Sequence, residues 1–323
     1  MKRTSEVVYY GSVKCQGLKK SGELCTNGAY YEQKGQYLCG CHSDKNKRKE
    51  LPKDKDEKRR KLALYEEHKK AVTFLASSEN REKGKVQCYK MGMMKNVPLF
   101  DGYLNIFPNN KHQNRVDGFG CASLSPMQLG PVVHRQPGLP DSLNIENYHQ
   151  YNKVWPNEVD KDKNPLPLYE EKKRAAYRDP VPHRHKYDLK EMKKLREQVN
   201  GQNRNQPLYS IHLTLDGEKR RFTYVESRYF YCKAYEVLAK KTKDFGYLRK
   251  LRENGTHLMI CGYDAYEVTR PLYDHYCDEV KAFGHELVLY TLLTVKDPVE
   301  YPWNVYREKH ADLYRNIAHV VEQ

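Results

Sequence analysis

The sequence is poor in the large apolar side chains that fill membrane spans and deep protein cores. It has 8 phenylalanines and 2 tryptophans among 323 residues, and its mean hydropathy is −0.94. No apolar run approaches the roughly 20 residues that a helix needs to cross a bilayer, and no apolar stretch follows the charged residues at the N-terminus. These absences argue against a transmembrane helix and a secretory signal, so we expect a soluble intracellular protein without a membrane partner.

The chain is also short of acidic residues, with 42 Asp and Glu against 57 Lys and Arg, which gives a formal net charge of +15. Such an excess attracts phosphate-bearing partners, so contact with nucleic acid through a basic surface is one interpretation. Much of the excess lies between Lys45 and Lys70. Asp54, Asp56 and Glu57 interrupt that run, which favours a solvated helix with internal ion pairs as the other interpretation.

Cysteine is not scarce, but its distribution argues against a disulfide framework. The nine cysteines are an odd number, and only those near the N-terminus cluster. Cys15, Cys25, Cys39 and His42 have the spacing Cys-x9-Cys-x13-Cys-x2-His, which leaves Cys41 as a spare thiol. Thiolate and imidazole are the ligands that zinc prefers, and so small a segment has too little core to fold without metal. The spacing predicts a closed, structural zinc site, and reduced, unligated cysteines are the alternative.

Changes in composition along the chain predict three segments. Residues 1–44 form the zinc-binding module, residues 45–83 form a charged linker that runs into a helix, and residues 84–323 form the main domain. The main domain begins with short β-like pieces at 86–89 and 103–107 and continues with several helical patterns. This mixture predicts an α+β fold.

A β-hairpin and a buried strand are expected inside the main domain. Tyr209 to Thr214 alternates apolar and polar residues, Asp216-Gly217 is a turn signal, and Arg221 to Val225 returns as the second strand. The apolar run 258–261 is short enough for a buried strand. Further helices are expected over 168–177, 189–199, 226–241, 245–251, 283–293 and from Pro302 to Val320.

The stretch from Ser142 to Trp155 is predicted to form one helix, capped by Asp141 or Ser142 and ended before Pro156. Within it a carboxylate, an amide and an amine stand at i, i+4 and i+7, so they share one helix face. These residues are Glu146, Gln150 and Lys153. The Pro- and Gly-bent segment 124–131 is expected to fold over that face and to make it a polar site.

Two other places have polar side chains in positions that suit binding. His134 and Arg135 stand side by side before the central helix and could bind a phosphate, although a pair this short is also typical of an ordinary surface turn. Asp264 follows the predicted strand 258–261, and Glu286 lies near the start of the apolar helix 283–293. Both carboxylates could equally cap helices.

Residues Glu146 to Lys153, with the sequence Glu-Asn-Tyr-His-Gln-Tyr-Asn-Lys, resemble the Glu-His-Tyr-x-Gln-x-x-Lys helix of the NADAR superfamily. These YbiA-like N-glycosidases act on ADP-ribosyl groups and on riboflavin-pathway intermediates. Asn147 stands where the family usually has His. Residues 258–264 and 283–287 are similar to the family's C-terminal Asp and Trp-Gly segments, with Phe283 in the place of Trp.

The resemblance, which covers residues 123–293 with interruptions, implies a mainly helical YbiA-like main domain with a small sheet. It implies an N-glycosidase-like hydrolase whose partner is a ribose-phosphate small molecule or an ADP-ribosylated target. Lys153 would be the nucleophile, Glu146 the acid, and Gln150 would orient hydroxyl groups. The other substrate-binding candidates are His134, Arg135, Tyr263, Asp264 and Glu286.

The chain is also similar to uncharacterised proteins of large DNA viruses that carry the same Leu-Ser-Pro-Met and Arg-His-Lys stretches. That resemblance implies location in the cytoplasm or nucleus of a host cell, or in a virion. The second hypothesis is therefore a non-enzymatic viral structural or nucleic-acid-associated protein, with the zinc module docking viral partner proteins. Convergence of Glu146, Gln150, Lys153, Asp264 and Glu286 would favour the enzyme.

Overall fold

The computed structural model describes residues 8–78, 82–92, 97–185 and 207–320. The chain divides into two compact units, Met1–Leu64 and Tyr65–Gln323, called unit 1 and unit 2 below. The boundary falls within helix α1 (Glu57–Ser78), which occupies the predicted linker and helix. The helix predicted over 189–199 lies outside the described residues.

Unit 1 is built on a small antiparallel sheet. Its strands β1 (Tyr31–Gln33), β2 (Gln36–Leu38) and β3 (Lys49–Glu50) have the order β2-β1-β3. Lys34 and Gly35 join β1 to β2 with φ angles of +51° and +78°, the combination that a two-residue hairpin turn of type I′ requires. The small core of unit 1 consists of Cys15, Cys25, Leu38 and Cys39, with Tyr30 packed against it.

Unit 2 contains a four-stranded parallel sheet. Its strands are β4 (Val86–Lys90), β5 (Tyr103–Phe107), β6 (Phe119–Gly120) and β10 (His257–Gly262). Their order is β4-β10-β5-β6, and every neighbouring pair is parallel. The strand predicted over 258–261 is confirmed, and it lies inside the sheet.

Both faces of this sheet are covered, which explains why β10 reads as a continuous apolar run. Leu258 and Ile260 belong to the main core of unit 2, on the face where helix α8 (His285–Thr294) packs against β4 and β10. Met259 and Cys261 alternate with them and belong to a second, smaller cluster. The helix predicted over 283–293 is therefore central, and its leucines are buried.

A second sheet of unit 2 is antiparallel. It has the order β7-β8-β9, from the strands β7 (Lys153–Val154), β8 (Tyr209–Leu213) and β9 (Lys219–Phe222). Gly217 lies in the turn between β8 and β9 with φ +86°. The predicted hairpin is thus confirmed.

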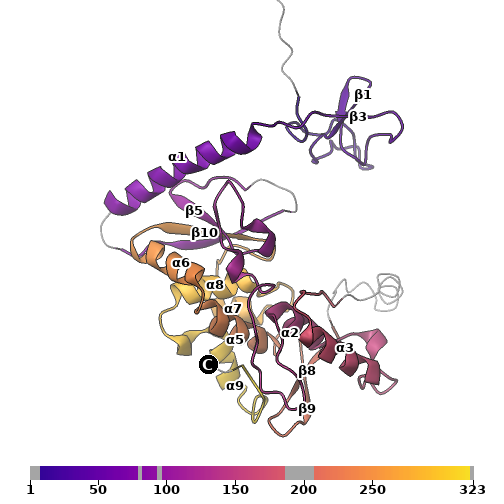
Figure 1. Ribbon diagram of the computed structural model, residues 1–323, viewed down its shortest axis with the longest axis vertical. Coiled ribbons are helices and arrows are strands. Elements are labelled where there is room, and N and C mark those ends of the chain that lie inside the picture. The colour runs from indigo at the N-terminus through magenta and orange to yellow at the C-terminus, as the bar shows by residue number, and fades with distance from the viewer. Residues whose placement is uncertain (1–7, 79–81, 93–96, 186–206, 321–323) are drawn as a thin grey trace, which may run out of the picture. The chain divides into compact units, whose positions relative to one another are not determined.

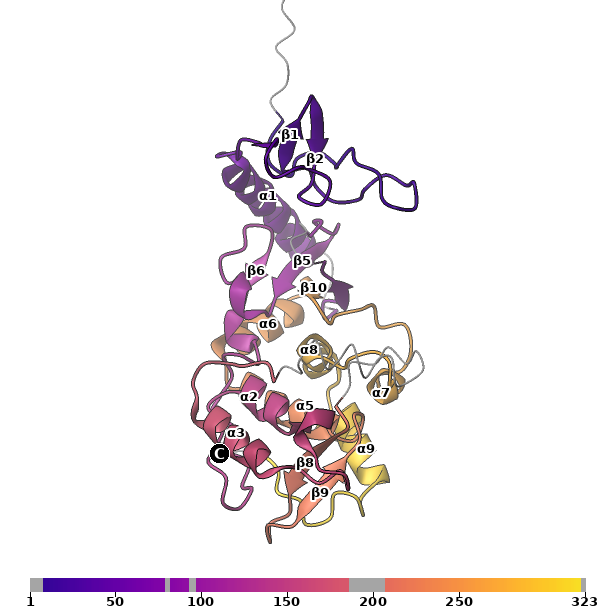
Figure 2. The same cartoon turned by 90° about the vertical axis from the view of Figure 1, so that its right-hand side faces the viewer.

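Unit 2 contains six further helices among the described residues. They are α2 (Ile145–Tyr151), α3 (Pro167–Arg178), α5 (Arg228–Ala239), α6 (Lys243–Glu253), α7 (Leu272–Cys277) and α9 (Pro302–Lys309). Short 3-10 turns are η1 (Asn110–His112), η2 (Ala122–Leu124), η3 (Pro156–Glu158) and η4 (Pro298–Glu300). In both views α5 and α8 separate the parallel sheet from the β8–β9 hairpin (Figures 1 and 2). The α+β prediction is confirmed.

The last predicted helix is wrong beyond Lys309. After α9 the chain turns back to the end of strand β8, where Ala318 N–H donates to Leu213 O at 2.9 Å and Leu215 N–H donates to Asn316 O at 2.9 Å. Asn316 has φ +56°, outside the helical region. Pairing with β8 therefore outweighs the amphipathic pattern of this segment.

Across the described ranges, every helix is either too short or too polar to cross a lipid bilayer.

Candidate functional site

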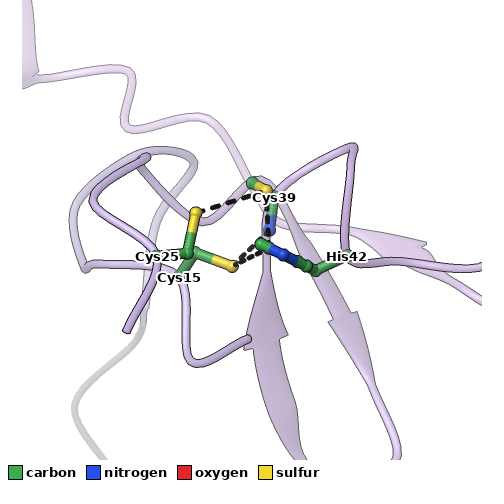
Figure 3. Close-up of side chains that lie close together, drawn as sticks. All are labelled: Cys15, Cys25, Cys39 and His42. Carbon is green, nitrogen blue, oxygen red and sulfur yellow. Dashed lines mark hydrogen bonds between the residues drawn. The ribbon is translucent and has the colours of Figure 1, made fainter. Parts of the chain in front are cut away.

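The four predicted metal ligands lie together in unit 1 (Figure 3). The ligand atoms of Cys15, Cys25, Cys39 and His42 all lie within 4.8 Å of one another. His42 Nδ1 is 3.4 Å from both Cys15 Sγ and Cys39 Sγ, while Cys41 is exposed. Three thiols and one imidazole at these distances could hold a single metal ion.

Hydrogen bonds favour the thiolate of Cys39, whereas burial raises the pKa of its neighbour Cys15. Cys39 N–H donates to Cys15 Sγ at 3.1 Å, and Asn27 Nδ2 donates to Cys39 Sγ at 3.9 Å. Burial raises the pKa of Cys39, but hydrogen bonds, first among them one from the Cys41 backbone, bring that pKa down to about 6. Cys39 therefore carries negative charge near neutral pH.

Gly17 leaves the room in which the His42 ring lies. A Cβ atom at position 17 would lie 2.5 Å from His42 Cγ, whereas a Cβ at Gly40 would meet only the Tyr31 ring at 3.9 Å. Neither glycine has a positive φ angle. Because position 17 has no side chain, the imidazole of His42 can occupy this space.

We expect Gly17→Ala to weaken metal binding by about 10–100-fold, the usual effect of disturbing a residue that orients a ligand. Gly40→Ala is the matched control, because its new methyl group makes only ordinary contact. Competition with a chromogenic chelator measures both affinities. Equal affinities in the two variants would show that the position of His42 does not depend on Gly17.

A second candidate site lies in unit 2, around helix α2. The helix is shorter than predicted, since the Asn144 side chain caps it by accepting Asn147 N–H at 2.8 Å. Asp141 and Ser142 are therefore not its caps. At the other end the chain leaves the helix at Asn152, and Lys153 pairs with Ser210 of strand β8. The prediction that Lys153 lies on the helix is wrong.

The segment 124–131, which was expected to fold over the polar face of α2, contacts the first turn of that helix. Pro126 O accepts Glu146 N–H at 3.0 Å, and Leu129 O accepts Ile145 N–H at 2.9 Å. The free N–H groups of a helix start need such partners. The segment therefore holds the start of α2 in place. It also contacts α5 and η1, where Tyr235 Oη donates to Leu124 O at 2.8 Å and Gln128 Nε2 donates to Asn110 Oδ1.

Glu146, Gln150 and Lys153 are nevertheless joined in a row. Gln150 Nε2 donates to Glu146 Oε1 at 3.0 Å, and Lys153 Nζ donates to Gln150 Oε1 at 3.4 Å. The amide stands between the carboxylate and the amine, so the two charged groups interact through it. The strand places Lys153 within reach of the helix that carries the other two.

This arrangement changes the acid–base chemistry of Lys153. Burial lowers the pKa of Lys153 to about 8, the Glu146 carboxylate opposes that effect, and the positive charge of Arg184 adds to it. The Asp264 carboxylate also raises the pKa of Lys153 and so opposes the effect of burial. A lysine with a pKa near 8 is partly neutral at physiological pH, and the neutral amine is the nucleophilic form.

The two other predicted carboxylates stand side by side at the ends of β10 and α8. Asp264 is exposed just after β10, whereas Glu286 is 0 % exposed. A Cβ at Gly262 would lie 1.9 Å from Glu286 Oε1, so this glycine makes the space for the carboxylate. Burial raises the pKa of Glu286, His285 lowers it, and Asp264 raises it further. Asp264 can meet a ligand directly, while Glu286 lies beneath the surface.

Tyr263, the remaining candidate after β10, turns toward η1. Its hydroxyl lies 3.1 Å from His112 Nε2, and the residue is 38 % exposed. The ring is therefore accessible at the carboxyl end of the parallel sheet. Among the described residues, none of its contacts is with Lys153.

Three residues of this region were not predicted from the sequence. The His149 ring lies 4.6 Å from the Tyr231 ring between centroids. Burial raises the pKa of Tyr231, and the carboxylates of Glu146 and Glu286 raise it further. Arg184 is the third, through its effect on Lys153. The charges of α2, β7, α8 and the end of β10 therefore act on one another.

His134 and Arg135 do not form the predicted phosphate site. His134 is 0 % exposed; its Nδ1 accepts Gln136 N–H at 3.0 Å and its Nε2 lies 3.0 Å from Pro140 O. Burial lowers the pKa of His134 to about 4, so the ring is neutral. Arg135 is exposed, with φ +54°. Because His134 is buried and Arg135 is exposed, the two side chains do not face one phosphate together.

Four of the twelve lysines and arginines between Lys45 and Lys70 are paired with nearby acids. Ion pairs link Lys47 with Asp44, Arg59 with Asp56, Arg60 with Asp54, and Lys61 with Glu57. Such exposed pairs add little stability. They do reduce the positive charge that this stretch offers to a nucleic acid.

No family model, curated protein or solved structure matches the chain.

Proposed function

We propose that unit 2 is an N-glycosidase-like hydrolase that acts on an ADP-ribosyl or related ribose-phosphate substrate. The observation that carries the proposal is the row of Glu146, Gln150 and Lys153, in which the lysine has a pKa of about 8. A direct ion pair with Glu146 would favour the charged amine and weaken the nucleophile. Gln150 stands between the two groups and keeps both functions in reach of one substrate.

In the proposed reaction the neutral Lys153 amine adds to the anomeric carbon as the bond to the departing base breaks. Glu146, which must carry a proton in the reacting form, gives that proton to the base. A proton then moves from Nζ to the ring oxygen, the ring opens, and a protonated imine joins Nζ to the sugar. Water hydrolyses the protonated imine, which releases the ribose aldehyde and the free amine, and the proton set free returns to the Glu146 carboxylate. Gln150 orients the sugar hydroxyls during these steps.

Asp264 and Glu286 support this chemistry in different ways. Asp264 is exposed and close enough to affect Lys153, so its carboxylate can accept hydrogen bonds from ribose hydroxyls. Glu286 lies beneath it with a raised pKa. Glu286 therefore holds a proton to higher pH than an exposed glutamate does.

The experiment that tests the function is borohydride reduction in the presence of ADP-ribose, which traps an imine as a stable adduct. We expect the adduct on the peptide that contains Lys153, and none in Lys153→Arg, because arginine keeps the charge but is not an amine nucleophile. Glu146→Gln should slow turnover by about 10²–10⁴-fold, the usual contribution of acid–base assistance.

Lys172→Arg is the matched control, since Lys172 is exposed on α3. Mass spectrometry of the digested protein locates the adduct. Adducts spread over exposed lysines such as Lys172, and unchanged in Lys153→Arg, would be ordinary glycation. That result would favour the alternative, a non-enzymatic zinc-containing viral structural or nucleic-acid-associated protein.

For unit 1 we propose that the bound metal is one structural zinc ion. Three thiols and an imidazole are a common zinc ligand set, and four protein ligands leave no open position for catalysis. Zinc would then supply the core that this small unit otherwise lacks.

A further inference from the structure

The segment that follows helix α3 is held against α2 by one buried amide. Asn147 is 0 % exposed. Its Nδ2 donates to Ala176 O, Asp179 O and Val181 O at 2.9, 3.0 and 2.9 Å. Its Oδ1 accepts His183 N–H at 2.7 Å. One side chain therefore fixes the backbone of the segment up to residue 183.

His185 fixes the same segment two residues later. Its Nδ1 lies 3.1 Å from Gln150 O at the end of α2, and its Nε2 lies 2.6 Å from Glu158 Oε1. Its ring stacks on Tyr151, with centroids 4.7 Å apart and an interplanar angle of 6°. The His185 ring is thus turned inward, and three contacts hold it.

Arg184 lies between these two anchors, and its side chain is exposed. In the part of the chain that the structure describes, no acidic side chain forms an ion pair with it. The arginine stands near Lys153, because its neighbour His185 contacts Gln150 O at 3.1 Å and the Gln150 side chain accepts from Lys153 Nζ at 3.4 Å. Its charge also lowers the pKa of that amine. The anchored backbone therefore presents an unpaired guanidinium beside the row of Glu146, Gln150 and Lys153.

We propose that Arg184 binds the phosphate group of the substrate beside Lys153. Guanidinium groups bind phosphate oxygens through two parallel N–H donors, and an arginine on an anchored backbone loses little freedom on binding. The inference rests on the proposed function for its substrate class, since the ligand would be a sugar phosphate with its anomeric carbon at Lys153.

The test measures binding without turnover. Wild-type protein and Arg184→Gln are titrated by calorimetry with ribose 5-phosphate, with unphosphorylated ribose and with inorganic phosphate. We expect Arg184→Gln to weaken ribose 5-phosphate and phosphate by about tenfold or more, as the loss of a hydrogen bond to a charged group typically does. Binding of ribose should change little. Arg184→Lys should recover part of the phosphate affinity.

Arg178→Gln is the control, because Arg178 is exposed in the last turn of α3. Equal phosphate affinity in wild type and Arg184→Gln would overturn the proposal. An equal loss in Arg178→Gln would also overturn it, since general surface charge would then explain the binding. A selective loss in Arg184→Gln together with no borohydride adduct on Lys153 would keep the phosphate site and reject the glycosidase.

Discussion

Removal of the metal ion should unfold unit 1 and leave unit 2 folded. Three of the four ligands are also the core of unit 1, together with Leu38 and Tyr30. Without the ion, little apolar surface remains to offset the loss of chain entropy. Binding of structural zinc by such small units contributes about 10–16 kcal/mol, so its loss exceeds the stability that the remaining contacts can supply.

Both tryptophans, Trp155 and Trp303, lie in unit 2, so their fluorescence reports on that unit alone. After treatment with a chelator we expect unchanged tryptophan fluorescence. We also expect rapid proteolysis within residues 8–56 and the loss of amide dispersion there in NMR spectra. Resistance of the metal-free protein to proteolysis in this region would contradict the prediction.

Substitution of one ligand should have the same effect as chelation. Cys25→Ser removes a buried ligand, whereas Cys41→Ser changes the exposed thiol that lies outside the cluster. Metal analysis should find one zinc per chain in wild type and Cys41→Ser, and none in Cys25→Ser. If metal analysis finds no zinc in freshly purified wild-type protein that has met no chelator, the prediction of a zinc site is wrong.

Acid should destabilise unit 2 well above the pH at which carboxylates are protonated. Burial lowers the pKa of His134 to about 4, and burial also lowers the pKa of His212 well below its usual range. In the unfolded chain both titrate near 6.5, so the unfolded state binds more protons between pH 6.5 and 4. Their contribution to stability is complete above pH 6.5 and is lost as the pH falls toward 4.

For His134 the difference of about 2.5 pKa units corresponds to about 3 kcal/mol. Urea unfolding followed by tryptophan fluorescence at pH 7, 6, 5 and 4 measures the effect. His134→Gln should reduce the slope of stability against pH, whereas His310→Gln, a change of an exposed residue, should not. An equal slope in wild type and His134→Gln would contradict the expected titration.

Local patterns in the sequence predicted those elements that depend on neighbouring residues. The hairpin of β8 and β9 follows from alternation around a glycine turn, and β10 follows from a short apolar run covered on both sides. The metal cluster follows from the ligand spacing between Cys15 and His42. In each case the deciding interactions either join residues that are close in sequence, or require only burial, whichever residues provide it.

The candidate site was only partly predictable, because distant segments complete it. Residues 146, 150 and 153 were expected on one helix, but pairing of Lys153 with Ser210 ends that helix early. The amine still reaches Gln150. Arg184 could not be found from spacing, since its position depends on contacts that Asn147 and His185 make with separate parts of the chain. His134 appeared accessible beside Arg135, and only packing shows that it is buried.

The place of β10 in the parallel sheet has a consequence for synthesis on the ribosome. Strands β4 and β5 are made early, yet each pairs with β10, whose residues 257–262 come more than 150 positions later. Until that strand has left the exit tunnel, β4 lacks its neighbour in the sheet, β5 can pair only with β6, and both strands expose unpaired edges. Unit 1 needs only local contacts and metal. We therefore expect nascent chains that end before residue 257 to hold a folded metal module followed by a segment that chaperones bind.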